Sequence, residues 1–281
     1  MKKIFCVALI LSYTFSVSQS KVEKSKSELN SSSRSSSSGS SSSSHSSSSS
    51  SKSSDSDDDL GILETIFGYT IYGFYYAAAG NYASEDHLHN DLSDYPYCNG
   101  TTGNYFDSES TDSTVVKKNF RFDLQENFLY SDNSLYANHL KAKIRPLQYF
   151  YVQADYHQLF EKNEATNTTD KLALFYFNLG YDRIRFKCFN FGWTLGASYV
   201  GNEVRKGGFA VGLNTEVFIG NNISLLASAK WSEINTKPVN LYELEAKYHL
   251  KRFFVSLGYQ HLKIATPTYN FASIGTGVYL N

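Results

Sequence analysis

The stretch that decides the fold runs from Phe189 to Trp231 and reads FNFGWTLGASYVGNEVRKGGFAVGLNTEVFIGNNISLLASAKW. Large apolar residues occupy every second position in three successive runs, at 189–199, 209–219 and 223–231. A period of two is that of a β-strand, whose side chains point alternately to opposite faces. The positions between carry small or polar residues. This pattern is the inverse of a soluble barrel, and it predicts a barrel that turns its apolar face to lipid.

The same alternation continues on both sides of this stretch, from residue 117 to residue 281. Seven further strands are predicted there, at 120–130, 136–145, 150–157, 175–181, 242–248, 253–260 and 274–280. We therefore predict an all-β fold, an antiparallel up-and-down transmembrane β-barrel over residues 117–281. The count gives about ten strands, with eight and twelve as alternatives.

The connections between the predicted strands alternate between tight turns and longer polar loops. Tight turns centre on Pro146, Arg183, Asn221 and Lys251, and the longer loops cover 161–170, 201–207, 233–238 and 263–270. Short turns on one side and longer loops on the other are typical of outer-membrane barrels. The pattern predicts that both termini lie on the short, periplasmic side.

The apolar face also predicts how the barrel meets the membrane. Aromatic residues at the long-loop ends of the strands are expected to form a girdle at the membrane surface, because Tyr and Trp concentrate at such interfaces: Tyr130, Tyr136, Tyr156, Tyr199, Trp231, Tyr242 and Tyr259. Mid-strand residues on the same face are expected to contact lipid: Phe191, Trp193, Leu195, Val211, Leu213 and Leu225. Outer-membrane lipid is the partner that both sets imply.

The opposite face of the strands carries charges of both signs, which are predicted to line the lumen: Arg121, Asp123, Lys141, Lys143, Asp155, Glu216, Glu243, Glu245 and Lys247. Ten strands enclose only slightly more space than eight, whose interior side chains just fill the barrel. An unpaired charge in such a narrow space is costly. We therefore expect ion pairs across the lumen and no wide pore.

The residues before the predicted barrel divide into three parts. Residues 1–18 have the basic start, apolar run and small residues of a secretory signal peptide, with cleavage expected after Ser18 or Ser20. Residues 19–59 are dominated by serine and end in aspartates, which predicts a disordered linker. Residues 60–116 are predicted to be a periplasmic or plug segment. Its apolar run at 60–80 fits a helix in or beneath the barrel, an irregular or strand segment, or a membrane helix.

Few residues predict a chemical site. His87 and His89 have a spacing that metals accept, but a solvated loop explains them as well, because the sequence places no third strong ligand. Cys98 and Cys188 remain after signal cleavage and are either disulfide-bonded, as the cell envelope permits, or free. No residue set predicts a cofactor. A net charge of −1 without a basic cluster argues against nucleic-acid binding.

The strand pattern of 117–281 and the leader composition resemble the small outer-membrane β-barrel proteins of Gram-negative bacteria. The serine-rich leader that ends in aspartates is similar to that of hypothetical members from the Bacteroidetes. The resemblance implies an outer-membrane location, insertion by the barrel assembly machinery, and a structural, adhesive or narrow-passage role. Barrels of this class usually end on an aromatic residue that the assembly machinery reads, whereas this chain ends with Leu280 and Asn281.

Two other classes of function are alternatives at this point. The omptin proteases also have ten-strand barrels, and in an enzyme of that architecture the candidate rim residues are Asp155, His157, Glu161, Asp170 and Glu233. The second alternative is a soluble secreted ligand-binding barrel. The sequence identifies no extracellular ligand.

Overall fold

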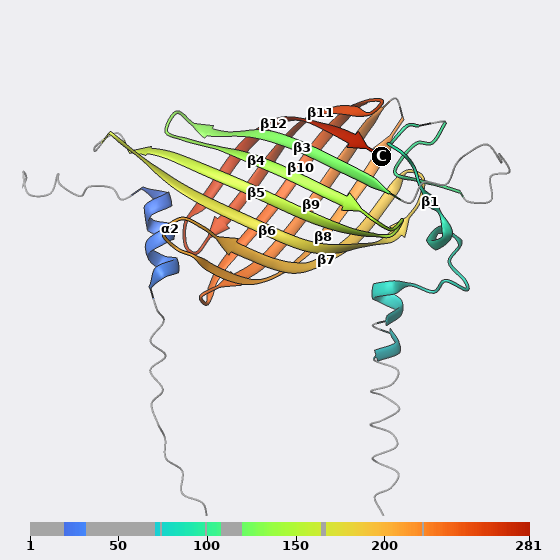
Figure 1. Cartoon of the computed structure of the whole chain (residues 1–281), viewed down its shortest axis with the longest axis horizontal. Coiled ribbons are helices and arrows are strands. Elements are labelled where there is room, and N and C mark those ends of the chain that lie inside the picture. The colour runs from blue at the N-terminus through green and yellow to red at the C-terminus, as the bar shows by residue number, and fades with distance from the viewer. Residues whose placement is uncertain are drawn as a thin grey trace, which may run out of the picture.

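The computed structural model describes residues 20–31, 71–73, 75–98, 100–107, 120–163, 167–220 and 222–281. Ten antiparallel strands close into one barrel (Figure 1). They are β3 (Arg121–Asp132), β4 (Leu135–Arg145), β5 (Phe150–Asn163), β6 (Thr168–Arg185), β7 (Phe189–Val200), β8 (Lys206–Ile219), β9 (Ile223–Ile234), β10 (Lys237–Leu250), β11 (Phe253–Ile264) and β12 (Thr268–Leu280). The predicted ten-strand barrel is confirmed, and every predicted strand corresponds to one of these.

The barrel is closed by pairing between its first and last strands. Phe122 of β3 pairs with Leu280 of β12 across this seam. The paired residues can also be traced from Phe122 in the other direction, through β4 to β11. This path reaches β12 at Thr268, twelve residues from Leu280. A stagger of this size requires strands that are tilted by about 35–45° from the barrel axis.

Side chains alternate between the lumen and the outer face along the strands. In β7, Asn190, Thr194 and Ser198 are buried inside, whereas Leu195 and Tyr199 are exposed outside. Most large apolar side chains that are exposed in the described residues lie on the outer face of barrel strands. The barrel is therefore polar inside for much of its length and apolar outside.

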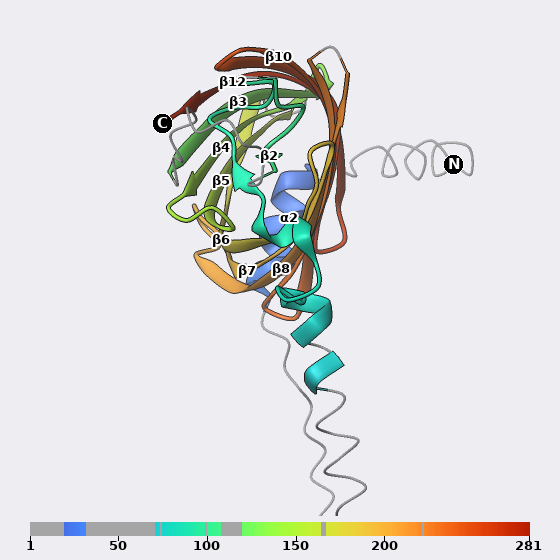
Figure 2. The same cartoon turned by 90° about the vertical axis from the view of Figure 1, so that its right-hand side faces the viewer.

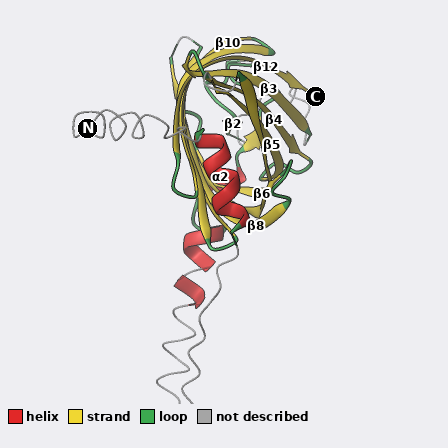
Figure 3. Ribbon diagram, turned by 90° about the vertical axis from the view of Figure 1, so that its left-hand side faces the viewer, coloured by secondary structure: helices red, strands yellow, loops and turns green. Residues whose placement is uncertain are grey.

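A helix that the sequence did not predict, α2 (Lys21–Asn30), lies in one mouth of the barrel (Figures 1 and 3). Its Val22 and Leu29 are fully buried and join an apolar cluster of inward-facing barrel residues. The prediction of disorder over 19–59 is therefore wrong for residues 20–31, and the rest of that range lies outside the described residues. Only two apolar residues mark the buried face of α2, so its packing surface comes from the barrel and is not visible in the local sequence.

Residues 80–98 and 100–107 fold against the opposite mouth of the barrel (Figure 2). They contain the 3-10 helix η1 (Asp86–His89) and a small sheet of β1 (Asp91–Leu92) and β2 (Tyr105–Phe106). Within the apolar run 60–80, residues 71–73 and 75–79 are helical and lie outside the barrel wall, so this part does not enter the lumen. Residues 60–70 are outside the described residues. None of the helices in the described ranges is long and apolar enough to cross a membrane.

One prediction about the ends of the barrel is wrong. The strands continue into the predicted long loops, because polar residues extend the pairing beyond the apolar part of each strand, and the turns at both ends have two to five residues. β3 begins and β12 ends at one end of the barrel, whereas residues 20–31, which include α2, lie at the opposite end (Figure 1). Ser20 donates a hydrogen bond to Asp170 at the α2 end, whereas Leu280 pairs with Phe122 at the other.

Candidate functional site: the closed lumen

The predicted lumen charges lie inside the barrel, and two ion pairs cross the lumen. The Lys141 ammonium on β4 is 2.8 Å from a carboxylate oxygen of Glu243 on β10. The Lys230 ammonium on β9 is 2.5 Å from a carboxylate oxygen of Asp155 on β5. In both cases the partner is four strands away around the wall. The side chains therefore bridge the lumen and do not merely line it.

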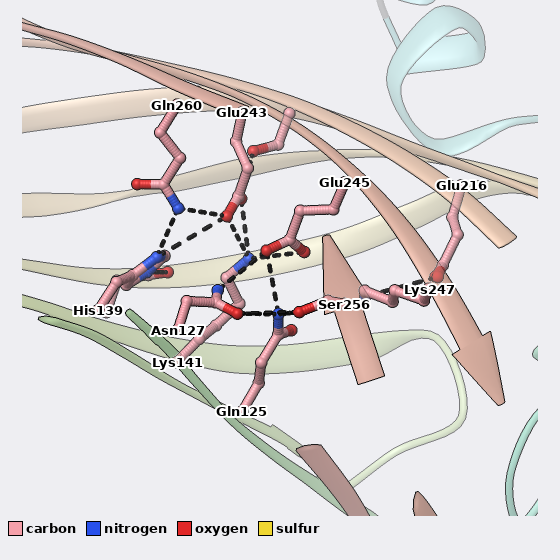
Figure 4. A network of polar contacts seen from close by, with 12 residues as sticks. Gln125, Asn127, His139, Lys141, Glu216, Glu243, Glu245, Lys247, Ser256 and Gln260 are labelled. Carbon is pink, nitrogen blue, oxygen red and sulfur yellow. Dashed lines mark hydrogen bonds and ion pairs between the residues drawn. The ribbon is translucent and has the colours of Figure 1, made fainter. Parts of the chain in front are cut away.

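A layer of amides and hydroxyls supports the first of these bridges (Figure 4). Gln125 and Asn127 donate hydrogen bonds of 3.0 and 2.9 Å to Glu245, which lies 3.7 Å from the Lys141 ammonium. The Gln260 amide donates to Glu243 at 3.0 Å. Buried charges are tolerated when further hydrogen bonds satisfy them, as here.

Three other ion pairs lie nearer the β1 end of the lumen. The Arg145 guanidinium is 2.6 Å from Asp182, the Arg121 guanidinium is 2.8 Å from Asp123, and the Lys247 ammonium is 3.5 Å from Glu216. The predicted lumen set omits Asp182, because the sequence there indicates a turn. In the structure β6 continues past it to Arg185, and the register shifts between Asp182 and Ile184. Lys230 is also missing from that set, although its alternation with Ala229 and Trp231 indicates an inward position.

The α2 end of the lumen holds a docking site for a helix. The Glu161 carboxylate accepts hydrogen bonds from the backbone N–H groups of Lys21 (3.1 Å) and Val22 (2.7 Å). At the other end of α2, the Lys206 ammonium and the Asn235 amide donate to the Leu29 carbonyl at 3.0 and 2.8 Å. These contacts satisfy backbone groups that a helix leaves unpaired at its ends, and their charges complement the helix dipole. The barrel thus binds α2 at both ends as well as along its apolar face.

The opposite mouth is covered by residues 91–106. Arg121 of β3 donates to the Ser93 carbonyl at 3.2 Å and to the Asn104 side chain at 2.9 Å. Tyr105 is fully buried, and its hydroxyl donates to Asp182 at 2.7 Å. Between the two covers, a cavity of about 50 Å³ remains in the charged half of the lumen. That is room for only a few waters.

The five candidate rim residues of an omptin-like enzyme do not form one site. Asp155 and His157 are buried inside the lumen, where His157 stacks on His139 with ring centroids 3.7 Å apart. Glu161 and Asp170 bind the start of α2. Glu233 is exposed near the end of β9.

The candidate metal ligands are His87 and His89, and the candidate disulfide joins Cys98 to Cys188 in the turn before β7. The His87 ring packs on Phe186, and burial lowers the pKa of this histidine, whereas His89 lies 2.8 Å from the Tyr82 carbonyl. Within the described ranges, no three His, Cys, Asp or Glu residues form a group that could hold a metal ion. Cys98 is buried and Cys188 is exposed, and both thiols are free, which is the second of the two alternatives for this pair.

The side chains predicted to contact lipid or to form the girdle all point away from the lumen. Leu195, Leu213 and Leu225 are exposed, and Phe191, Trp193 and Val211 are half-buried among their neighbours. The girdle residues lie toward the α2 end, and five of the seven touch other aromatic rings: Tyr136, Tyr156, Tyr199, Trp231 and Tyr242. Examples are the Trp231 indole, which donates to the Tyr242 hydroxyl at 3.0 Å, and the ring contacts of Phe175 with Tyr156 and Tyr199.

No family model matches this sequence, and no curated protein matches it. Among solved structures, the chain is similar to a loop L8 deletion mutant of OmpT, an outer membrane protein of Vibrio cholerae, at 17% identity and a TM-score of 0.31, over 56% of this chain and 62% of that one. LpxR from Salmonella typhimurium is similar at 9% identity and a TM-score of 0.35, over 58% of this chain and 85% of that one. The Yersinia pestis outer membrane protein Ail is similar at 11% identity and a TM-score of 0.34, over 57% of this chain and 99% of that one. The chain thus spans less than two thirds of the Vibrio protein. TM-scores this far below 0.5 carry no argument about function.

Proposed function

We propose that this chain is an outer-membrane β-barrel protein with a structural or adhesive role, whose lumen is closed by its own side chains and by α2. The observation that carries the proposal is the filling of the lumen. Ion pairs cross it at Lys141–Glu243 and Lys230–Asp155, and α2 occupies the mouth above them. A barrel filled in this way leaves no continuous wide passage.

The outer face supports placement in a membrane. It presents a belt of Leu, Val, Ile and Phe, with the girdle of aromatic residues toward the α2 end. The shortest barrel strand has 11 residues. At a tilt of about 40°, eleven residues reach about 28 Å along the barrel axis, which covers the roughly 25 Å apolar band of outer-membrane barrels. Lipid is therefore the partner that the outer face fits.

The helical residues 71–73 and 75–79 support the same placement. The last four carbonyls of this helix, from Tyr76 to Ala79, accept hydrogen bonds from barrel side chains that reach past the outer rim: Arg183, Trp193 and Tyr181. Ile71, Tyr72 and Tyr75 remain more than half exposed. The segment extends away from the wall at the β1 end (Figures 1 and 2). In a membrane this is the level of the headgroups, where tyrosine is favoured.

We place the end where β3 begins and β12 ends toward the periplasm, as is usual for barrels of this kind, and the α2 end toward the outside. Insertion would then depend on the barrel assembly machinery. Detergent extraction tests the membrane placement: the mature protein should appear in the outer-membrane fraction and change its gel mobility on boiling. Recovery in the soluble fraction without detergent would contradict it.

Single-channel recording tests the closed lumen. The purified mature protein in planar bilayers should show no large, stable conductance, whereas such conductance in the unmodified protein would overturn the proposal. Two variants separate the two closures. Leu29→Asp should release α2 and leave the charged layer closed, so its conductance should remain small. The double change Lys141→Ala and Glu243→Ala, added to Leu29→Asp, should open the lumen.

A further inference from the structure

The cavity in the charged half of the lumen is bordered by more cations than carboxylates. Six basic residues border it: Arg121, Lys141, Lys143, Arg145, Lys230 and Lys247. The acidic residues on its wall are Asp123, Glu216 and Glu243. The wall therefore carries more positive than negative side chains, and how each cation is compensated decides what the cavity can hold.

Five of these six cations have a carboxylate oxygen within 4 Å. The pairs are those already described for Arg121, Lys141, Arg145, Lys230 and Lys247. Among the described residues, Lys143 has none. Its ammonium lies 4.5 Å from the centre of the Tyr151 ring, and the Arg145 guanidinium lies 4.9 Å from the same centre. Two cations thus share one aromatic ring, and only Arg145 has an acidic partner.

Two hydrogen-bond donors on the cavity wall also lack a partner within the described residues. The Thr194 hydroxyl belongs to a side chain that is 4% exposed, and the Nε of Arg145 to one that is 3% exposed. Both residues border the cavity. Buried donors without partners cost free energy, so a group that accepts from them would be favoured there.

We propose that this cavity binds a small inorganic oxyanion of the size and charge of phosphate or sulfate. Lys143 supplies an ammonium with no carboxylate oxygen within 4 Å, and Thr194 and Arg145 supply the free donors. The three acidic residues on the wall are already paired, which lowers their repulsion of an anion. Lys143 itself borders the cavity. The inference does not depend on the membrane role, because it rests on the lumen alone.

Equilibrium dialysis of the purified, folded mature protein against radiolabelled inorganic phosphate tests this site. About one phosphate should bind per barrel, and sulfate at equal ionic strength should compete better than chloride. Lys143→Met should weaken binding at least tenfold, and Thr194→Val should weaken it severalfold. Lys162→Met is the matched control, because Lys162 is exposed on β5 away from the cavity, and this variant should bind like the unmodified protein.

Absence of phosphate binding by the unmodified protein would overturn the site. Equal binding by the unmodified protein and by folded Lys143→Met or Thr194→Val would overturn it as well, because the phosphate would then be held elsewhere. If Lys143→Met does not fold, Thr194→Val decides the matter, since it keeps every lumen charge. Failure of this test leaves the conductance result unaffected, so the two proposals are judged separately.

Discussion

Glu126 stands out among single residues, because β3 places this carboxylate on the outer face in the middle of the apolar belt. It is exposed, with Leu124 and Phe128 as its outward neighbours along the strand. Across the sheet it pairs in register with Leu140 and Thr276. An ionisable group facing lipid at this depth costs free energy and commonly marks a functional position.

Replacing Glu126 by leucine should stabilise the barrel in lipid by about 1–2 kcal/mol, since outward Asp and Glu cost less than the roughly 2–4 kcal/mol of Arg or Lys at the midplane. Equilibrium unfolding by guanidinium in liposomes measures the change. Glu233→Leu is the control, because Glu233 lies near the end of β9, close to the α2-end turn, and should change little. A loss of stability in Glu126→Leu would show that Glu126 has a favourable contact in the membrane.

For single residues, the sequence predicts which face of the barrel wall a side chain occupies better than it predicts which side chain it pairs with. Alternation alone is enough to place Lys141 and Glu243 inside. Their pairing depends on the twelve-residue stagger, which no local pattern reveals. Asp182 and Arg185 were beyond reach for a different reason, since the register shift beside them changes which residues point inward.

Among the elements, the barrel strands were predictable and α2 was not. A strand that faces lipid must carry apolar residues at every second position, so its signal is repeated several times. In α2 the run KVEKSKSELN carries only Val22 and Leu29 as apolar residues, seven positions apart. Such a run is stable as a helix only where the barrel supplies the rest of the core.

Leu29→Ala should weaken the docking of α2 by about 2–5 kcal/mol, the usual cost of removing a fully buried leucine side chain. Hydrogen exchange of the α2 amides measures it, and exchange in the barrel strands should be unchanged. Lys24→Ala serves as the control, because half of the Lys24 side chain is exposed. Equal exchange in both variants would mean that the apolar face does not hold the helix.

Residues 80–90, which precede the cover of the other mouth, should respond to acid through Glu85. Hydrogen bonding from Arg183 lowers the pKa of Glu85, and the two side chains are 2.7 Å apart. A carboxyl whose folded pKa is lowered stabilises the fold above its unfolded pKa of about 4.3, and this contribution is lost as the pH falls through the folded value. The backbone N–H of Asn81 donates to Glu85 at 2.7 Å. Below about pH 4 it should therefore lose protection from hydrogen exchange, relative to the intrinsic exchange rate at the same pH. Glu85→Gln should remove this pH dependence, and its persistence would point to another group.

For the whole molecule, the lumen has an apolar half under α2 and a charged half under β1 and β2. The two halves face opposite sides of a membrane in the proposed orientation. Ser31→Cys should react with a membrane-impermeant maleimide on intact cells, because Ser31 is exposed at the α2 end. Lys251→Cys, in the turn before β11 at the other end, should react only after the outer membrane is opened. Labelling in the reverse order would invert the orientation.

The contacts that hold α2 determine when this helix can dock relative to the formation of the barrel. Its partners come from strands all around the barrel: Glu161 on β5, Asp170 on β6, Lys206 on β8, and both the Ile264 carbonyl on β11 and the Tyr269 hydroxyl on β12, which lie 3.2 and 2.7 Å from the Ser25 hydroxyl. These groups meet only once the last-made strand is in place. α2, the first described element, can therefore dock only after β12, the last one, has formed. In a refolding time course, the α2 amides should gain protection from hydrogen exchange no earlier than the amides of the seam between β3 and β12.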